Sequence, residues 1–365
     1  MKESLSSYFS KVSDPSSLRN QHHPFTTIIG TSFLSVLSGI DSFSGMQLFA
    51  EAHLDELEKY FDFPSGVPSH DTFQRFWDSI SPNEFLEAFT YFTQNIEKVT
   101  GDVISIDGKT IRNSGKNKSL HIVSAWCEVN QLVLAQEKVD EKSNEITAIP
   151  QLLKLLDLRD RIVTIDAMGA QREICEQIVG QLGDYLICLK GNQGTLHEDV
   201  RLYLEDQSHH QECNENNDKG HGRLEQRTAV ISRAISWLQK EHDWPGLKTI
   251  GMVSSCVSKK DKESSETRFY ISCLELSAQQ LNDIARRHWG IENQLHWRLD
   301  VVFNEDKACI RNDNAAENMD IMRKWALNSM SRVKEKPDQS IKGIMRKNSM
   351  SFKYLISNVK KIFHA

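Results

Sequence analysis

Two apolar runs that each lead to an aspartate place the strongest constraint on the fold of this chain. Residues 103–112 read VISIDGKTIR and residues 161–169 read RIVTIDAMG, so β-branched residues precede Asp107 in one run and Asp166 in the other. Such runs favour strands, and an acid at the end of a buried strand is unfavourable unless it meets a cation or a donor. We therefore expect two strands that end at their acids, with a turn at Gly108, and one cation shared by the two carboxylates.

A third acid, Glu292, lies far along the chain in a segment with helical periodicity. It shares three- and four-residue steps with Leu281, Ile284, His288, Ile291, Leu295 and Leu299, so we expect it to point inward from a helix. Three carboxylates from three elements form the oxygen-ligand set that Mg²⁺ or Mn²⁺ prefers. The alternative is that each acid caps a helix, pairs with a surface cation or faces water.

A zinc site at His288, Glu292 and His296 is a weaker candidate. The three residues are spaced four apart, but the segment does not match H-E-x-x-H. The chain also contains no Walker-type phosphate loop, no G-x-G-x-x-G that opens a helix after a strand, and no G-x-S-x-G. Nucleotide-cofactor and serine-hydrolase functions therefore have no support in the sequence.

Composition limits the class of protein further. The 365 residues carry a net charge of -6, which argues against a simple nucleic-acid coat, yet residues 307–365 contain 13 Lys and Arg against 5 Asp and Glu. Seven scattered cysteines form no C-x-x-C pair, which indicates a cytoplasmic protein without a disulfide framework or a zinc knuckle. The apolar stretch 25–40 is interrupted by Thr, Ser and Gly and is shorter than the roughly 20 residues of a membrane span.

The order of the expected elements predicts an α/β protein with a helical start. After several short helices, strands are expected at 103–107, 120–126, 132–139, 162–166 and 185–189, with helices at 144–155 and 171–181 between the later ones. Beyond them we expect a polar loop at 209–222, strands at 222–231 and 268–274, a charged turn at 258–267, and a long helix capped by Ser277 that runs past Asp300. The predicted division is 1–100, a helical domain for packing or DNA contact; 101–195, the first part of a catalytic core; 196–276, a β-rich insertion; and 277–365, the last catalytic helix and a basic helical region.

Five motifs in this order resemble those of the H-repeat-associated transposases, a bacterial insertion-sequence family of D-D-E enzymes. They are ISIDGKTI (104–111), DEKSNEITAIP (140–150), TIDAMG (164–169), KGNQG (190–194) and HWGIENQLHWRLDV (288–301). The resemblance covers nearly the whole chain. It implies a ribonuclease H-like mixed sheet with flanking helices, in which Asp107, Asp166 and Glu292 are the catalytic residues and hold Mg²⁺ or Mn²⁺.

The surroundings of Glu292 depart from the wider D-D-E group. Where that group carries a Tyr, an Arg and a Lys, this chain has Ala285, His288 and Leu299. The candidate DNA and phosphate contacts are instead basic, amide and aromatic residues: Lys109, Lys190, Asn192, Arg287, His288, Trp289, His296 and Trp297. The basic tail, residues 323–361, is expected to contact backbone phosphates.

These features predict a transposase that cuts and joins double-stranded DNA at the ends of an insertion sequence by two-metal phosphoryl transfer. The expected protein works as a homodimer or higher assembly on DNA, in the cytoplasm and at the nucleoid, without a membrane partner. Two alternatives remain open. One is an inactive relict that still binds DNA, and the other is a metal-dependent endonuclease without strand transfer.

Overall fold

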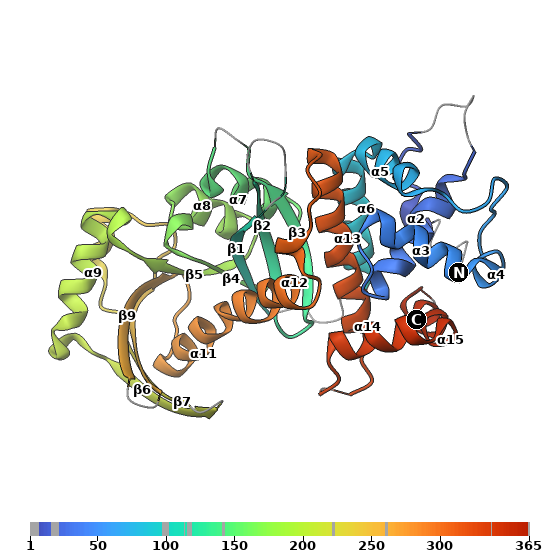
Figure 1. Ribbon diagram of the computed structural model, residues 1–365. Helices are drawn as coiled ribbons and strands as arrows, with labels where there is room; N and C mark the ends of the chain where they lie inside the picture. The colour runs from blue at the N-terminus through green and yellow to red at the C-terminus, as the bar shows by residue number, and fades with distance from the viewer. Residues whose placement is uncertain are drawn as a thin grey trace.

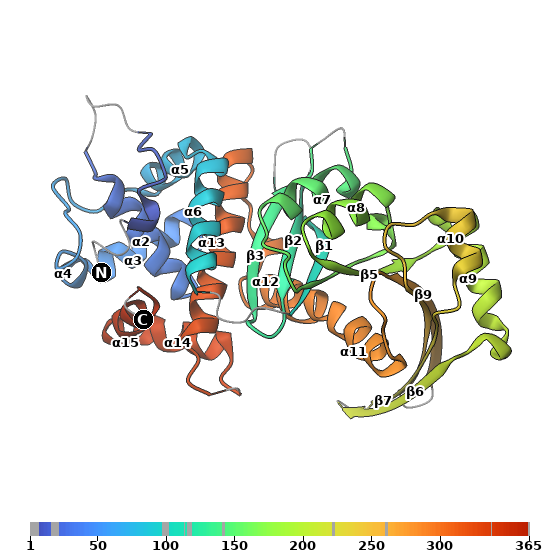
Figure 2. The same cartoon turned by 180° about the vertical axis from the view of Figure 1, so that it is seen from behind.

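The chain folds into a twisted sheet at one end and a body of helices at the other. The computed structural model describes residues 7–15, 22–96, 102–112, 114, 119–140, 143–220, 223–259, 262–336 and 338–363. Figure 1 shows the sheet and the helical body side by side, and Figure 2 shows them from behind. Both ends of the chain lie in the helical body, although the sheet is built from its middle.

The first five strands form the mixed sheet that the sequence predicts. They are β1 (Val103–Ile111), β2 (Leu120–Cys127), β3 (Leu132–Lys138), β4 (Ile162–Ile165) and β5 (Asp184–Leu189). Their order is β3-β2-β1-β4-β5, in which β1, β2 and β3 pair antiparallel while β1, β4 and β5 run parallel. This is the ribonuclease H-like arrangement, and it makes the two aspartate-bearing strands neighbours.

One face of this sheet is covered by α7 (Glu145–Lys154) and α8 (Arg172–Gly180), and the other by α11 (Ala278–His288), as Figure 1 shows. The side chain of Asn144 accepts a hydrogen bond from the backbone N–H of Ile146 and so caps α7. The helices predicted at 144–155 and 171–181 are therefore confirmed to within a residue or two at each end.

The turn predicted at Gly108 is wrong, because β1 continues through it to Ile111 and pairs with β2 over its whole later half. Gly108 lies opposite Val123, and a Cβ at this position would collide with the carboxylate of Glu145 and with Nε2 of His121. The glycine thus allows the close approach of a neighbouring side-chain pair and does not break the strand. Asp107 consequently lies inside β1 and not at its end.

The insertion extends the same sheet. It contributes β6 (Glu212–Gly220), β7 (Arg223–Ser232), β8 (Thr249–Lys259) and β9 (Lys262–Ser272), and β9 pairs antiparallel with β5. The polar loop predicted at 209–222 and the charged turn predicted at 258–267 are therefore wrong. In β6 intermediate and exposed side chains alternate, so the strand has no apolar face by which the sequence would reveal it.

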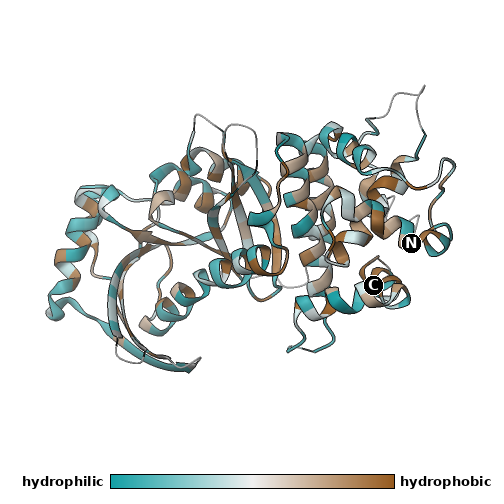
Figure 3. Ribbon diagram, in the orientation of Figure 1, coloured by the Kyte–Doolittle hydropathy of each residue, from teal (hydrophilic) through white to brown (hydrophobic). Residues whose placement is uncertain are grey.

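The helical body joins the two ends of the chain. It contains α2 (Phe25–Leu37), α3 (Phe43–Ala52), α4 (Leu54–Leu57), α5 (His70–Ser79), α6 (Pro82–Ile96), α13 (Asp313–Arg332), α14 (Ile341–Met350) and α15 (Phe352–Phe363). Trp325 of α13 is buried, and its ring centroid lies 4.9 Å from that of Phe9, 5.5 Å from that of Phe85 and 5.2 Å from that of Phe92. In Figure 3 apolar and polar segments alternate along these helices, as expected for helices that bury one side.

This packing removes two cations, Arg323 and Lys324, from the basic tail that is expected to contact phosphates, whereas Lys342, Arg346 and Lys347 are exposed. Arg323 and Lys324 are each only 2% exposed; Arg323 pairs with Asp41, and Lys324 pairs with Asp320. Two of the tail's cations are therefore paired with acids in the interior. Among the residues that the structure describes, no helix combines the length and apolar character needed to cross a membrane.

Candidate active site

The two aspartates lie beside each other, immediately after the last paired residues of the parallel strands β1 and β4. In the parallel register of β1 and β4, Ile106 pairs with Ile165, and the next residues are Asp107 and Asp166. The carboxylate of Asp166 accepts a hydrogen bond of 3.0 Å from the backbone N–H of Met168, which caps the short helix η1 (Ala167–Gly169). Strand pairing thus brings together two acids that are 59 positions apart in the numbering.

The third acid comes from a distorted helix that packs against these strands. Ser277 and Gln280 form a capping box at the start of α11, as predicted. Beyond His288 the chain passes through a π-helical turn, η4 (Ile291–His296), before α12 (Trp297–Val301). π-Turns inside helices occur frequently at functional sites.

Glu292 lies in this widened turn and is exposed, which corrects the prediction that it points into the core. The apolar members of the predicted face, including Ile291, Leu295 and Leu299, are buried as expected. Glu292 directly follows the buried Ile291, and adjacent residues of a helix point in different directions, so Glu292 lies at the margin of the buried face. Glu292 therefore lies at an open rim of the site.

The three acids influence one another electrostatically. The pKa of Asp107 is raised to about 7, first by burial and then by the negative charge of Glu292, with smaller contributions from Glu145 and Asp166. A hydrogen bond from the backbone of Gly108 acts in the opposite direction. The pKa of Glu292 is also raised, first by burial and then by Asp166, against the lowering effect of Arg268 and Lys190.

Histidine 296 contacts this group without neutralising it. Nδ1 of His296 lies 3.6 Å from Oδ2 of Asp107. Burial, followed by the positive charges of Lys109 and Lys324, lowers the pKa of His296 to about 3, so its ring is neutral at pH 7. Asp107 therefore keeps an excess of negative neighbours, which is the environment that a divalent cation relieves.

The comparisons with known proteins agree with this architecture. The family model described as Transposase DDE domain matches residues 99–329, and one described as DDE_Tnp_1-associated matches residues 6–93. The H repeat-associated putative transposase YhhI of Escherichia coli (strain K12) is 38% identical over 348 residues, which cover 92% of this chain and 92% of that protein. This chain belongs to the DDE transposase family.

Two further similarities accompany this membership. The Putative transposase YncI of Escherichia coli O157:H7 is 38% identical over 351 residues, which cover 91% of this chain and 88% of that protein. The structure of a piggyBac transposase synaptic complex with hairpin DNA aligns with a TM-score of 0.45 at 10% identity, over 98% of this chain and 77% of that chain. The predicted resemblance to the H-repeat-associated transposases is confirmed by the relatives.

Two predicted phosphate contacts of this DDE transposase, Lys109 and Arg287, form ion pairs with acids of the protein. Lys109 is 12% exposed and forms ion pairs with Asp300, at 2.6 Å, and with the fully buried Glu305. Arg287 pairs with Asp102 and lies 3.5 Å from Glu128. The prediction that Lys109 faces the substrate is therefore corrected, because this largely buried cation offsets the charge of nearby acids within the protein. Arg287 also pairs with acids, but its side chain is 31% exposed, and its proposed contact with DNA stays a prediction.

Two other predicted contacts, His288 and Asn192, form hydrogen bonds that link elements of the site. Nδ1 of His288 lies 3.0 Å from Oγ1 of Thr164, and burial lowers the pKa of His288 to about 4, so this ring is neutral at pH 7 and supplies no positive charge. The side-chain amide of Asn192 donates a hydrogen bond of 2.8 Å to the carbonyl of Ala167, the residue after Asp166. Asn192 thus links the loop after β5 to the loop that carries Asp166.

Arg268 is a site residue that the sequence reasoning missed. The pairing of Leu189 with Phe269 puts the exposed Lys190 of the KGNQG motif next to Arg268 on the adjoining strand. The guanidinium carbon of Arg268 lies 3.9 Å from the ring centroid of Trp289, and its charge opposes the rise in the pKa of Glu292 that burial causes. Only the register of β5 with β9 reveals this neighbourhood, because no local motif joins Arg268 to Glu292.

A groove runs from Glu292 along the insertion. It has a volume of about 630 Å³ and lies between β7, β8 and β9 on one side and α11 with η4 on the other. Its lining includes Arg227, Arg268, Arg286, Arg287, Trp289 and Glu292. The second predicted tryptophan, Trp297, is 54% exposed just beyond the π-turn. The groove therefore combines cations and an aromatic ring beside the acids.

Proposed function

We propose that this protein is an active transposase that cuts double-stranded DNA at the ends of an insertion sequence and joins the cut ends to target DNA. Asp107, Asp166 and Glu292 are the proposed metal ligands. The observation that carries the proposal is the parallel pairing of β1 with β4, which puts Asp107 beside Asp166. The pKa of Asp107, raised by burial and by the charges of Glu292 and Asp166, supports a negative site that includes all three acids. The proposal places the protein in the cytoplasm, at the DNA on which it acts.

The residues of the site fit Mg²⁺ or Mn²⁺, since both ions prefer oxygen ligands and tolerate bound water. Asp107 and Asp166 would hold the ions from adjacent strands, and Glu292 from the π-turn. When bound, a pair of such ions activates the attacking oxygen and stabilises the leaving oxygen of a phosphodiester. The carboxylates then act as ligands, and none is required to act as a general base.

The chain's own residues would bind and orient the DNA. Lys190 and Arg268 lie close enough to Glu292 for their charges to oppose the rise in its pKa that burial causes, so they are placed to offset the charge of a phosphate at the acids. Arg268 covers the face of Trp289, whereas Trp297 leaves half its surface open for stacking on a base. His288 and Asn192 would keep β4 and the Asp166 loop in position.

A cleavage and joining assay tests the proposal. The substrate is a plasmid that carries the insertion-sequence ends found beside this gene, incubated with Mg²⁺ or Mn²⁺ and a second target plasmid. The wild-type protein is expected to release cut ends and join them to the target. The substitutions Asp107→Asn, Asp166→Asn and Glu292→Gln are each expected to abolish both products, while Glu87→Gln, an exposed helical control, leaves them unchanged.

The alternatives give different products in the same assay. DNA binding without any metal-dependent cutting would identify an inactive relict. Cut ends that are never joined would identify an endonuclease. Cutting that persists in the Glu292→Gln protein would remove Glu292 from the proposed ligand set. Mass measurement of the complex on end DNA tests the proposed homodimer or higher assembly.

A further inference from the structure

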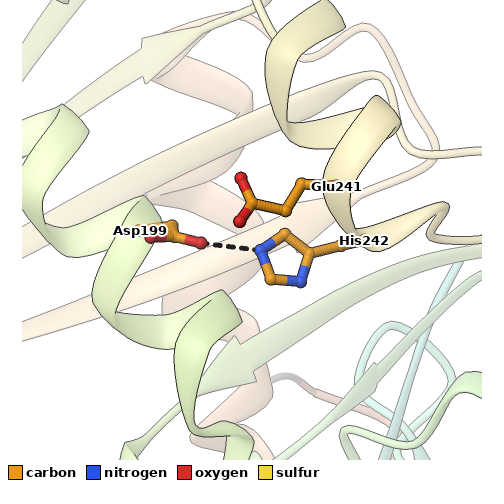
Figure 4. Close-up of side chains that lie close together, drawn as sticks. All are labelled: Asp199, Glu241 and His242. Atoms are coloured by element: carbon orange, nitrogen blue, oxygen red, sulfur yellow. Dashed lines mark hydrogen bonds and ion pairs between the residues drawn. The ribbon is translucent and has the colours of Figure 1, made fainter.

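A second group of ligand-type side chains lies away from the three acids. Asp199 comes from α9 (Thr195–Glu205), and Glu241 and His242 come from the end of α10 (Ser236–His242). One ligating atom from each of these residues lies within 4.8 Å of the other two. Figure 4 shows the three side chains directed into the same space between the helices.

The two better-buried members already contact each other. Nε2 of His242 lies 2.7 Å from Oδ2 of Asp199, and their side chains are 13% and 29% exposed. The carboxylate of Glu241, an exposed residue, lies beside this pair. The site thus combines two partly buried donors that contact each other with a third, exposed donor.

The helices that carry the group are positioned by other contacts. Leu196, Val200 and Leu204 of α9 are buried, and so is Leu238 of α10. The side chain of Gln239 donates a hydrogen bond of 2.6 Å to the carbonyl of Leu247, which ties α10 to the segment that leads into β8. The spacing of the three donors therefore does not depend on the ionic contact between His242 and Asp199.

We propose that Asp199, Glu241 and His242 form a binding site for a divalent transition metal, for which Zn²⁺ is the best match. One imidazole nitrogen with two carboxylates is an N/O ligand set that zinc accepts, whereas Mg²⁺ and Ca²⁺ prefer oxygen ligands alone. Three protein ligands leave the fourth tetrahedral position to water. His242 is the last residue of α10, where the partial negative charge of the helix end favours a cation.

Metal binding here requires an exchange of one proton. A hydrogen bond between Nε2 and Asp199 places a proton between these atoms, and a metal bound to Nε2 needs the lone pair of that nitrogen. The proton on Nε2 passes to the solvent, and the neutral ring takes up one proton from the solvent at Nδ1, so the imidazole keeps a single hydrogen while the cation binds the lone pair of Nε2 and the carboxylates. The result is a clamp that joins the helix after β5 to the helix between β7 and β8.

Calorimetric titration of the full-length protein with ZnCl₂ tests this site, and the visible absorption of bound Co²⁺ gives a second readout that is independent of activity. The sharpest variant is Glu241→Gln, because it removes one exposed donor and leaves the contact between His242 and Asp199 intact. His242→Gln removes the nitrogen ligand. His70→Gln is the matched control, since His70 contacts one acid, Asp71, at 3.2 Å on the surface.

The wild-type protein and the His70→Gln control are expected to bind one more Zn²⁺ than the His242→Gln protein, with Co²⁺ absorption that this variant lacks. The Glu241→Gln protein is expected to lose at least tenfold in affinity at this site. At a Zn²⁺ concentration 100-fold above Kd, the wild-type Tm is expected to rise by roughly 5 °C through preferential binding to the folded state. Equal Zn²⁺ stoichiometry and affinity in all four proteins would overturn the proposal.

Discussion

Replacing Asp107 with asparagine is expected to make the metal-free protein more stable at pH 8, although it removes a proposed metal ligand. Burial and the neighbouring acids raise the pKa of Asp107 from 3.8 to about 7, which means that ionising it is less favourable in the folded protein than in the unfolded chain. A shift of this size corresponds to at most about 4 kcal/mol of unfolding free energy. Asparagine has nearly the same shape and carries no charge, so it removes this cost.

The pH dependence has a definite sign. Between about pH 4 and pH 7 the folded protein holds a proton on Asp107 that the unfolded chain has released. This group therefore lowers the free energy of unfolding as pH rises, by up to about 1.4 kcal/mol per pH unit. The variant lacks that contribution, so the two proteins should differ most above pH 7 and converge below about pH 4.

Urea unfolding in EDTA, followed by tryptophan fluorescence from pH 4 to pH 8, measures the difference. The exposed-acid control Glu87→Gln is expected to stay within about 0.5 kcal/mol of the wild type at every pH. Adding Mn²⁺ at pH 8 should then stabilise the wild type and not the Asp107→Asn protein. A variant that is no more stable than the wild type at pH 8, or a gap that persists at pH 4, would refute the electrostatic account of the site.

Three further substitutions test other parts of the structure by equilibrium unfolding. The wild-type protein should lose stability as pH falls from 6.5 to 4, because burial lowers the pKa of His288 to about 4 and the unfolded chain binds the proton more readily. His288→Asn should reduce that loss by up to about 3 kcal/mol, and an unchanged pH profile would contradict the burial effect. Lys109→Met should cost about 3–5 kcal/mol at neutral pH, since it leaves the buried Glu305 without its closest cation, and a neutral effect would restore Lys109 as a candidate substrate contact. Trp325→Ala should cost about 3–5 kcal/mol by opening a cavity among the rings of the helical body, and a loss below 1 kcal/mol would contradict the shared core of the two chain ends.

The central strands of the fold could be predicted from local patterns. The β-branched runs before Asp107 and Asp166 identify strands, and parallel pairing of those strands brings the acids together. The strands of the insertion could not be found in the same way. Both the predicted loop and the predicted charged turn are polar hairpin strands, whose solvent-facing side chains lack the apolar alternation that marks a half-buried strand.

The candidate site could be predicted only in part, because its ion pairs join residues that are far apart in the sequence. The sequence predicts Lys109 as a substrate contact, but its partner Glu305 lies 196 positions later, and no local pattern indicates that pairing. Arg268 was missed because only the pairing of β5 with β9 brings it to the acids. Glu292 lies in a π-turn, which three- and four-residue periodicity does not anticipate.

The most direct test of the central claim is a crystal of the protein soaked in Mn²⁺, with anomalous scattering used to locate the ions. The account predicts anomalous density bounded by the carboxylates of Asp107, Asp166 and Glu292, and its loss in crystals of the Asp107→Asn protein. Mn²⁺ density elsewhere in the molecule with none at these three acids would contradict the assignment of this edge of the sheet as the catalytic centre.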